Sequence, residues 1–180
     1  MQEAYYGRTY ASPLGEIFIV SDGKAILSLC IEKQRYLKPL PSVPVADGSK
    51  DPVLRQTIEW LEAYFHGEKP NAEAVPLFLQ GSTFQKCVWH ILLEIPYGEL
   101  VTYGEVAKEA AKRLGRERMS AQAVGGAVGH NPISIIVPCH RVIGANGNLT
   151  GYAGGIDKKI KLLQHEGVDM SRLFLPKRYH

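Results

Sequence analysis

Cysteine is scarce in this sequence, and so are clustered histidines and long apolar runs. The three cysteines, Cys30, Cys87 and Cys139, are an odd number and lie far apart, so no disulfide framework is expected in a chain of 180 residues. The six histidines are scattered, and no CxxC or HExxH spacing predicts a metal site. No apolar run is long enough to span a bilayer, and the first twenty residues lack the pattern of a signal peptide. We therefore expect a cytoplasmic protein without a bound metal or cofactor.

Net charge is also small, at +3, but it is unevenly distributed. Residues 1–80 carry 8 Lys/Arg against 10 Asp/Glu, whereas residues 81–180 carry 13 against 8. The positive excess of the second part is either an ordinary surface fluctuation or a face for an anionic partner. Hydrophobic residues make up 45% of the chain, which is enough apolar material for a core.

Residues 1–80 are predicted to form a small β-rich domain. Two β-rich runs flank Asp22-Gly23, a dipeptide typical of a two-residue hairpin turn. Residues 37–52 are rich in proline and small side chains and are predicted to be a loop. A second loop containing proline and glycine follows later, with a short strand near residues 75–79.

One helix is predicted in this first domain. Asp51 suits its N-cap and Pro52 its first position, and an apolar stripe at helical spacing runs from Val53 to Phe65. The boundary to the second domain is predicted near Gly81.

Residues 81–180 are predicted to form a mainly helical domain. Ser82 and Gln85 have the spacing of a capping box at the start of its first helix. Thr102 and Ser120 are predicted to cap two further short helices, which together indicate a helix-turn-helix. The predicted fold class is therefore α+β, with a β-rich N-terminal domain and a helical, winged-helix-like C-terminal domain.

The third predicted helix, "AQAVGGAVG", consists almost entirely of small residues. Its adjacent glycines, Gly125 and Gly126, each cost roughly 1 kcal/mol of helix stability relative to alanine. Either a neighbouring helix packs closely there, or a ligand must approach the backbone. A helix with such small side chains suits a narrow minor groove, where it reads little base sequence.

The stretch "IIVPCHRVIG" places a thiol beside an imidazole. Residues 133–138 are predicted to form a short buried strand whose terminal proline puts Cys139 at the strand end. His140 or Arg141 would increase the thiolate population, and Glu166 would orient His140 as the third member of a relay. The alternative is that Cys139 is a buried structural cysteine, the interpretation that we give to Cys30 and Cys87.

The motif "PCHRVIG", preceded by "AVGGAVGHNPISIIV" and followed by "GYAGG" and "LLQHEG", closely resembles the O6-alkylguanine-DNA alkyltransferases. The resemblance runs from about Phe84 to Gly167, and the first 80 residues match in outline. It implies that Cys139 takes the alkyl group from the O6 position of guanine in DNA, once per molecule and irreversibly. O4-alkylthymine is a second lesion to consider.

The resemblance also implies roles for individual residues. His140 would deprotonate Cys139 through a bridging water while Glu166 holds the imidazole. Asn131 would be a hinge, and Tyr103 would assist the departing guanine or promote base flipping. The other residues expected at the guanine pocket or the DNA are Thr102, Ala121, Gln122, Ala123, Gly125, Ala127, Arg141, Val142, Tyr152, Ala153 and Gly154. Among them, Arg141 is expected to act chiefly as a tether between elements.

The implied partner is double-stranded DNA, bound by a monomer through the minor groove with little sequence preference. Arg113, Arg116 and Arg118 flank the predicted helix-turn-helix and are the basic side chains expected to contact phosphates.

The sequence departs from the family pattern in three places. Gln122 stands where many members have an arginine that fills the gap left by the flipped base. Ala153 stands where some members have a serine that contacts O6. No ligand set for the N-terminal zinc of some members is found.

Three other functions are compatible with parts of the pattern. A lesion-binding relative that does not repair would lack the reactive cysteine, which is present here. A regulator that senses alkylation would use the helix-turn-helix but would need an effector domain. A cysteine hydrolase would use Cys139, His140 and Glu166, but it would need an oxyanion loop that the sequence does not indicate.

Overall fold

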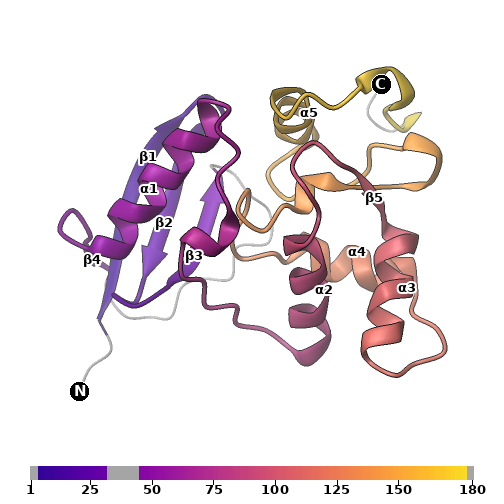
Figure 1. Cartoon of the computed structure of the whole chain (residues 1–180), viewed down its shortest axis with the longest axis horizontal. Coiled ribbons are helices and arrows are strands. Elements are labelled where there is room, and N and C mark those ends of the chain that lie inside the picture. The colour runs from indigo at the N-terminus through magenta and orange to yellow at the C-terminus, as the bar shows by residue number, and fades with distance from the viewer. Residues whose placement is uncertain (1–3, 32–44, 178–180) are drawn as a thin grey trace. The chain divides into compact units, whose positions relative to one another are not determined.

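The computed structural model describes residues 4–31 and 45–177 (Figure 1). The chain divides into two compact units. Residues 1–80 group with residues 132–134, and residues 81–131 group with residues 135–180. The short segment 132–134 joins the first unit because Ile133 forms a bridge with Leu29 of the sheet.

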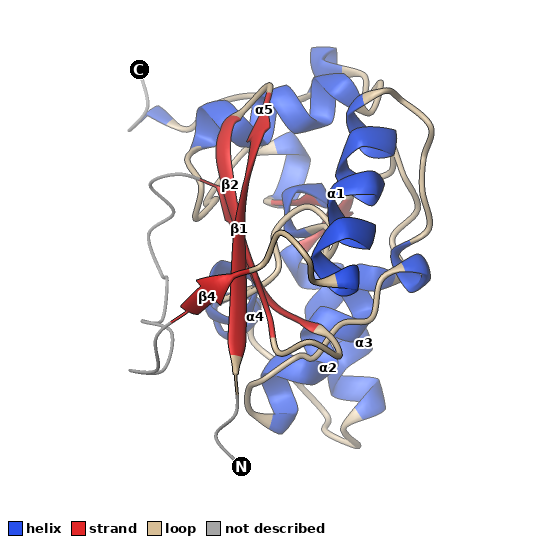
Figure 2. Ribbon diagram, turned by 90° about the vertical axis from the view of Figure 1, so that its left-hand side faces the viewer, coloured by secondary structure: helices blue, strands red, loops and turns tan. Residues whose placement is uncertain are grey.

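A four-stranded sheet and one helix form the first unit. The strand order is β3-β2-β1-β4, in which β4 runs parallel to β1 and the other pairs are antiparallel (Figure 2). The strands are β1 (Tyr5–Ser12), β2 (Gly15–Ser21), β3 (Ile26–Ile31) and β4 (Val45–Asp47).

The hairpin predicted at Asp22-Gly23 exists, but its loop has four residues rather than two. The carboxylate of Asp22 accepts hydrogen bonds of 2.8 Å from the backbone N–H groups of Lys24 and Ala25. This side chain replaces the tight backbone turn that the dipeptide predicts.

The interpretation of residues 37–52 as a loop is wrong for β4, which adds to the edge of the sheet beside β1. Residues 37–44 of that stretch lie outside the described residues. The short strand predicted near residues 75–79 is reduced to a single bridge between Leu77 and Ile26.

Helix α1 (Pro52–Phe65) begins as predicted, with the Asp51 carboxylate accepting the N–H of Val53 at 2.8 Å. Its apolar stripe packs against β1 and β2. A short 3-10 helix (Ala72–Ala74) follows it.

Four helices and a two-stranded parallel sheet form the second unit. Ser82 and Thr102 both form complete capping boxes, with Gln85 and Glu105, and Ser120 caps the third helix. These elements are α2 (Thr83–Leu93), β5 (Val101–Thr102), α3 (Tyr103–Arg113), α4 (Ala121–Gly129), β6 (Val142–Ile143) and α5 (Ile156–His165). Three 3-10 helices complete the unit: Cys139–Arg141, Ala145–Gly147 and Met170–Arg172.

Helices α2, α3 and α4 pack against one another as a helix-turn-helix with a supporting helix. The indole N–H of Trp89, on α2, donates to the carbonyl of Ala127, on α4, at 2.9 Å. This buried hydrogen bond fixes the rotation of α4 about its own axis, so that Val124 and Val128 face inward. Among the described helices, none is long and apolar enough to cross a bilayer.

Candidate active site

The prediction that residues 133–138 form a strand is wrong. The apolar side chains of the run are buried, but the chain turns there, and Ile135 has φ 71°. A positive φ is strained for a β-branched residue, so the surrounding contacts must impose it. One such contact is the hydrogen bond from the Asn131 side-chain amide to the Val137 carbonyl, 2.8 Å long, which closes the turn.

Cys139 therefore lies at the start of a 3-10 helix and not at a strand end. Its side chain is 3% exposed, and its backbone N–H donates to the Val137 carbonyl at 2.8 Å. Burial raises the pKa of the thiol, while a hydrogen bond with Asn131 and the nearby charge of Lys159 act in the opposite direction. The resting residue is thus a thiol, which needs a base to become a nucleophile.

The structure brings His140 and Glu166 together. His140 is fully buried, and its Nε2 is hydrogen bonded to Oε2 of Glu166. The other oxygen of Glu166 accepts from Nε of Arg141 at 2.6 Å and from the backbone N–H of Gly98 at 3.1 Å. Arg141 also donates to the Ile95 carbonyl at 2.6 Å, so it links the active-site 3-10 helix to α5 and the end of α2, as a tether would.

These contacts set the protonation of the pair. Burial alone would raise the pKa of Glu166, but His140 and Arg141 outweigh it and lower that pKa to about 2. Burial lowers the pKa of His140, so at neutral pH the imidazole is neutral. An ionised Glu166 fixes the proton on Nε2, which leaves the lone pair on Nδ1. Nδ1 is buried and accepts no hydrogen bond from a described residue, so it is the nitrogen free to act as a base.

Lys159, on α5, belongs to the site although the sequence did not indicate it. Its side chain is fully buried, and its ammonium donates to the carbonyls of Val142 and Thr150. Burial lowers its pKa to about 8, and its charge faces Cys139. Lysines on amphipathic helices usually reach solvent. The sequence signal for an inward-facing Lys159 was limited to the apolar residues one helical turn before and after it, Ile156 and Leu163.

The segment after Thr150 forms a wall of the site. The Tyr103 hydroxyl, at the start of α3, donates to the Thr150 carbonyl at 3.2 Å. The Tyr152 side chain acts to lower the pKa of the Cys139 thiol, against the larger opposite effect of burial. Ala153 and Gly154 are buried beside them, and Val142 is buried with its carbonyl bound to Lys159.

Helix α4 presents one open face of small residues. Gln122 and Gly126 are exposed, and a methyl group added at Gly126 would meet nothing within 4 Å. At Gly125 the nearest atom is Cε1 of Tyr103, at 4.0 Å. Close helix packing therefore does not explain these glycines. The exposed side chains of Ala121 and Ala123 complete the start of this helix.

Two of the residues predicted to contact DNA, Ala127 and Arg113, are already engaged within the fold. Ala127 is 4% exposed on the inward face of α4, so its side chain cannot meet a ligand on the open face. Arg113 is engaged by Glu94 and by Glu109, the latter at 2.9 Å. These partners offset its charge, whereas Arg116 and Arg118 form no ion pair with a described residue.

No metal site is built into the part of the chain that the structure describes: nowhere in it do three His, Cys, Asp or Glu side chains gather around a common point.

Two family models together match most of the chain. Residues 83–168 match the DNA-binding domain of 6-O-methylguanine DNA methyltransferase, and residues 5–79 match its ribonuclease-like domain. A methylated-DNA–protein-cysteine methyltransferase of Haemophilus influenzae is 41% identical over 98% of both chains. One of Methanosarcina acetivorans is 44% identical over 90% of this chain and 98% of its own.

Solved structures agree with the sequence relatives. The crystal structure of Mycobacterium tuberculosis OGT in complex with DNA matches with a TM-score of 0.77 and 41% identity, over 93% of this chain and 94% of that one. The structure of an O6-methylguanine DNA methyltransferase from Methanococcus jannaschii matches with a TM-score of 0.63 and 26% identity, over 94% and 99%. The chain belongs to the 6-O-methylguanine DNA methyltransferase family.

Proposed function

We propose that this protein repairs DNA by moving the alkyl group of O6-alkylguanine onto Cys139. The proposed activity rests on the family, whose members transfer an alkyl group from DNA to a protein cysteine. The observation that supports the residue assignment is the buried His140–Glu166 pair, whose histidine directly follows the buried Cys139 in the chain. Cys30 and Cys87, by contrast, have no histidine as a neighbour in the chain.

The proposed reaction begins with a proton transfer. Nδ1 of His140 takes the thiol proton of Cys139 through a bridging water, and Glu166 stabilises the imidazolium that forms. The thiolate then attacks the alkyl carbon, the bond between that carbon and O6 breaks, and a thioether forms. The guanine anion that leaves takes up a proton, for which the Tyr103 hydroxyl is the proposed donor. The thioether has no route back to a thiol, so each molecule reacts once.

The proposed DNA contact is the open face of α4. A stacked guanine hides its O6 substituent from a buried thiol, so the base must leave the helix first. Small side chains at Ala121, Ala123 and Gly126 let the backbone of α4 enter a minor groove that is only about 6 Å wide. Contacts to backbone phosphates would give little sequence preference, and we propose that a monomer suffices.

A duplex that carries one O6-methylguanine with a labelled methyl group tests this function. Label should move to the protein in a one-to-one ratio and appear in the peptide that contains Cys139. Retention of all label in the DNA would contradict the proposed activity, even if the protein binds the duplex.

Gln122 is the long side chain on the open face of α4, and we propose that it fills the space left by the flipped guanine. We expect Gln122→Ala to slow transfer from duplex DNA roughly 5- to 30-fold. Without the inserted side chain, about 1–2 kcal/mol of the free energy needed to unstack the guanine is no longer offset. Reaction with free O6-benzylguanine, which needs no flipping, should not change. Single-turnover rates on both substrates measure this.

Two variants control that experiment. Gln164→Ala makes the same chemical change at an exposed position of α5 and should leave both rates unchanged. Gln122→Arg should match or exceed the wild type on duplex DNA, because a cation near phosphates favours binding. Equal duplex rates for the wild type and Gln122→Ala would remove this residue from the mechanism.

Lys159 is proposed to stabilise the thiolate and to hold the wall of the site. In Lys159→Met, the charge that favours the thiolate and two anchors on backbone carbonyls are lost. Because hydrogen bonds to charged groups contribute about 1.5–3 kcal/mol, reaction with O6-benzylguanine at pH 7 should slow roughly 10- to 100-fold. The midpoint of its pH–rate profile should also move to higher pH. Lys161→Met, on the exposed side of α5, is the control, and equal midpoints in Lys159→Met and Lys161→Met would refute the assignment.

A further inference from the structure

The C-terminal segment (residues 169–175) pairs with the part of the chain that leads into the wall of the active site. It begins after residue 168, where the match to the family's DNA-binding domain ends. The segment contains the 3-10 helix Met170–Arg172, and the Asp169 side chain caps that helix by accepting the N–H of Ser171 at 3.0 Å. The segment is therefore an ordered part of the second unit.

Two backbone hydrogen bonds join this segment to residues 147–149. The N–H of Phe174 donates to the Gly147 carbonyl at 3.0 Å, and the N–H of Leu149 donates to the Phe174 carbonyl at 2.8 Å. A methyl group added at Gly147 would lie 2.1 Å from the carbonyl oxygen of Arg172, so the two backbones are in direct contact. This pairing fixes residues 147–149 against the C-terminal segment.

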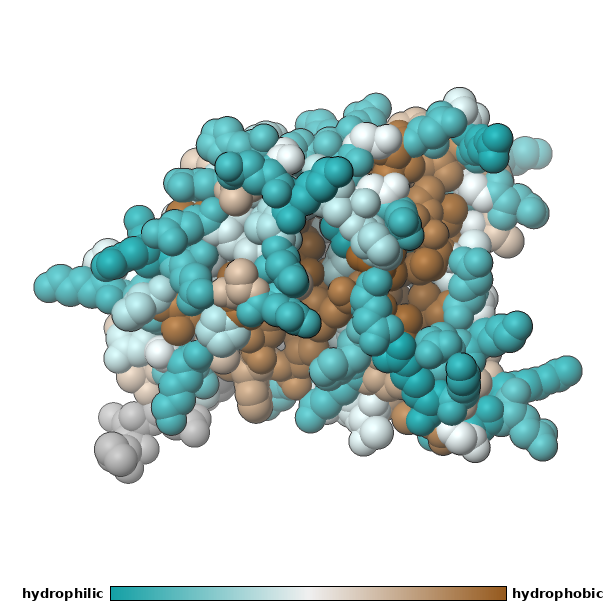
Figure 3. Space-filling view, viewed as in Figure 1, coloured by the Kyte–Doolittle hydropathy of each residue, from teal (hydrophilic) through white to brown (hydrophobic). Residues whose placement is uncertain are grey.

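An apolar cluster supports the same contact. Its buried centre consists of Ile143, Leu149 and Leu163. The partly buried side chains packed against that centre include Met170, Leu173 and Leu175 of the C-terminal segment. Hydrophobic side chains are visible in the upper right of Figure 3, below the place where Figure 1 marks the C-terminus. Because Leu149 takes part in both the backbone pairing and the cluster, the two contacts hold one short stretch of chain.

That stretch leads directly into the wall. Thr150 follows Leu149, and its carbonyl accepts from the Tyr103 hydroxyl at 3.2 Å and from the Lys159 ammonium at 2.9 Å. Tyr152, one of the residues expected at the guanine pocket, comes two residues later. The wall is thus fixed at Thr150 by two side chains of the site, and just before Thr150 by the C-terminal segment.

We infer that the C-terminal segment is a positioning element for the guanine pocket, and that the backbone of Phe174 makes its main contact. The inference rests on the proposed function. A flipped base is held by the walls of its pocket, so a wall that is displaced part of the time binds the base more weakly. The pair of His140 and Glu166 is built from another 3-10 helix and the end of α5, so activation of the thiol should not depend on the segment.

Phe174→Pro tests the backbone pairing in the full chain. Proline has no N–H, and its ring takes the place of the proton that Phe174 directs to the Gly147 carbonyl. Leu173 has φ −106° and ψ 145°, a conformation that a residue before proline prefers, so the change does not strain it. Because both backbone hydrogen bonds weaken, the concentration of free O6-benzylguanine that gives half the maximal single-turnover rate should rise roughly 5- to 20-fold. The maximal rate and the midpoint of the pH–rate profile should not change.

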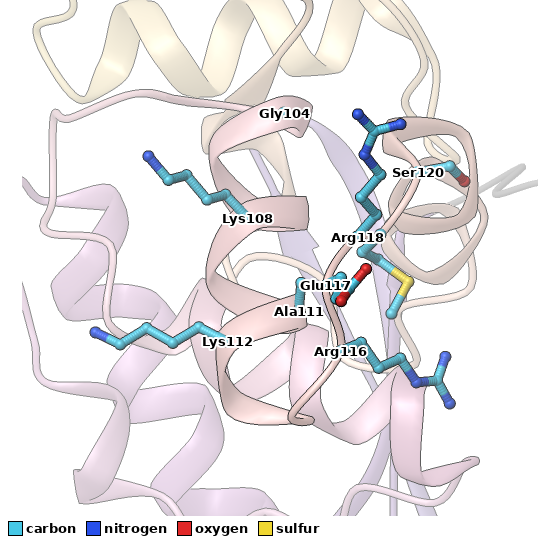
Figure 4. Close-up of a pocket in the computed structure, with 9 residues that line it drawn as sticks. Gly104, Lys108, Ala111, Lys112, Arg116, Glu117, Arg118 and Ser120 are labelled. Carbon is cyan, nitrogen blue, oxygen red and sulfur yellow. The ribbon is translucent and has the colours of Figure 1, made fainter.

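Phe174→Ala separates the backbone from the side chain. It removes the exposed ring but keeps the N–H, so its half-saturating concentration should stay within about twofold of the wild type. Leu173→Ala weakens the apolar contact and should raise that concentration roughly 2- to 5-fold, whereas Leu173→Met should restore it. Met119→Ala is the matched control. It removes as many non-hydrogen atoms from a half-buried side chain that lines a hollow on α3 and on the connection from α3 to α4 (Figure 4), and it should change neither parameter.

Iodoacetamide distinguishes a displaced wall from a damaged fold. The Cys139 thiolate attacks its methylene carbon and iodide leaves, and the reagent is too small to need the guanine pocket. Its rate with Phe174→Pro, followed on the peptide of Cys139, should be at least that of the wild type. Equal half-saturating concentrations in Phe174→Pro and Phe174→Ala, or a parallel loss of rate with both reagents, would overturn the positioning role.

Label transfer from DNA tests the proposed function separately. A wild type that takes up the benzyl group from the free base but never a methyl group from duplex DNA would overturn the repair function. The difference between Phe174→Pro and Phe174→Ala with the free base would still support the role of the C-terminal segment.

Discussion

We expect Cys139→Ala to abolish alkyl transfer while binding of unmodified duplex stays within about twofold of the wild type, since phosphate contacts provide the affinity. The thiol is the only group of the site that can form the thioether, so its loss leaves no slower route. Cys139 is buried, but alanine removes a single atom, and we expect the free energy of unfolding to fall by about 1 kcal/mol. Label transfer measures the first effect, and fluorescence anisotropy measures the second.

Matched cysteine variants sharpen this result. Cys30→Ala and Cys87→Ala remove the same atom from β3 and α2, and both should transfer label at the wild-type rate. Cys30 is buried in the sheet with its thiol directed to the Phe18 carbonyl, 3.8 Å away, and Cys87 is only partly buried. Mass spectrometry should find one added alkyl group on the peptide of Cys139. An alkyl group on the peptide of Cys30 or Cys87 would identify that cysteine, and not Cys139, as the nucleophile.

Local patterns predicted most helix starts of the fold, because a cap depends on residues that are adjacent in the chain. Asp51, Ser82, Thr102 and Ser120 each cap the helix that the sequence assigns to them. The same reasoning failed at residues 133–138. A buried apolar run reads as a strand, but a side-chain bond from Asn131 to Val137 and the left-handed Ile135 turn the chain instead.

The features of the site that could not be predicted from the sequence depend on contacts between residues far apart in the chain. His140 and Glu166 were paired from the motif, and they do meet. Lys159 was missed because nothing in a helix pattern says that an ammonium will find carbonyls of two distant segments. The ion pairs of Arg113 were missed for a similar reason, since Glu94, one of its two carboxylate partners, lies at the C-terminal end of a different helix, α2.

The relay of His140 and Glu166 gives the second large effect. We expect His140→Ala to slow reaction with O6-benzylguanine at neutral pH by roughly 10²- to 10⁴-fold, the usual contribution of a general base. Glu166→Gln should slow it as well, because a neutral amide stabilises the imidazolium less than a carboxylate does. The double variant should be no slower than His140→Ala alone, since the two residues act as one unit.

The pH dependence separates the base from other influences on the thiol. Burial raises the pKa of Cys139, so without its base the thiol ionises only at higher pH, and both variants should regain rate as pH rises. The wild type needs neutral His140, whose pKa is lowered by burial, so its rate should hold through neutral pH and fall only in more acidic solution. Profiles of both variants that coincide with the wild type would assign thiolate stabilisation to Asn131 and Lys159 instead.

Glu166→Gln also leaves the buried guanidinium of Arg141 without its carboxylate, and an unpaired buried charge costs about 3–5 kcal/mol of stability. A slow variant could therefore be a poorly folded one. Adding Arg141→Met removes the unpaired charge and should restore much of the melting temperature. If Glu166 acts through His140, the rate of the Glu166→Gln, Arg141→Met double variant stays low. Its pH–rate profile also stays shifted from that of the wild type. Recovery of the rate together with the melting temperature would show that Glu166 only supports the fold.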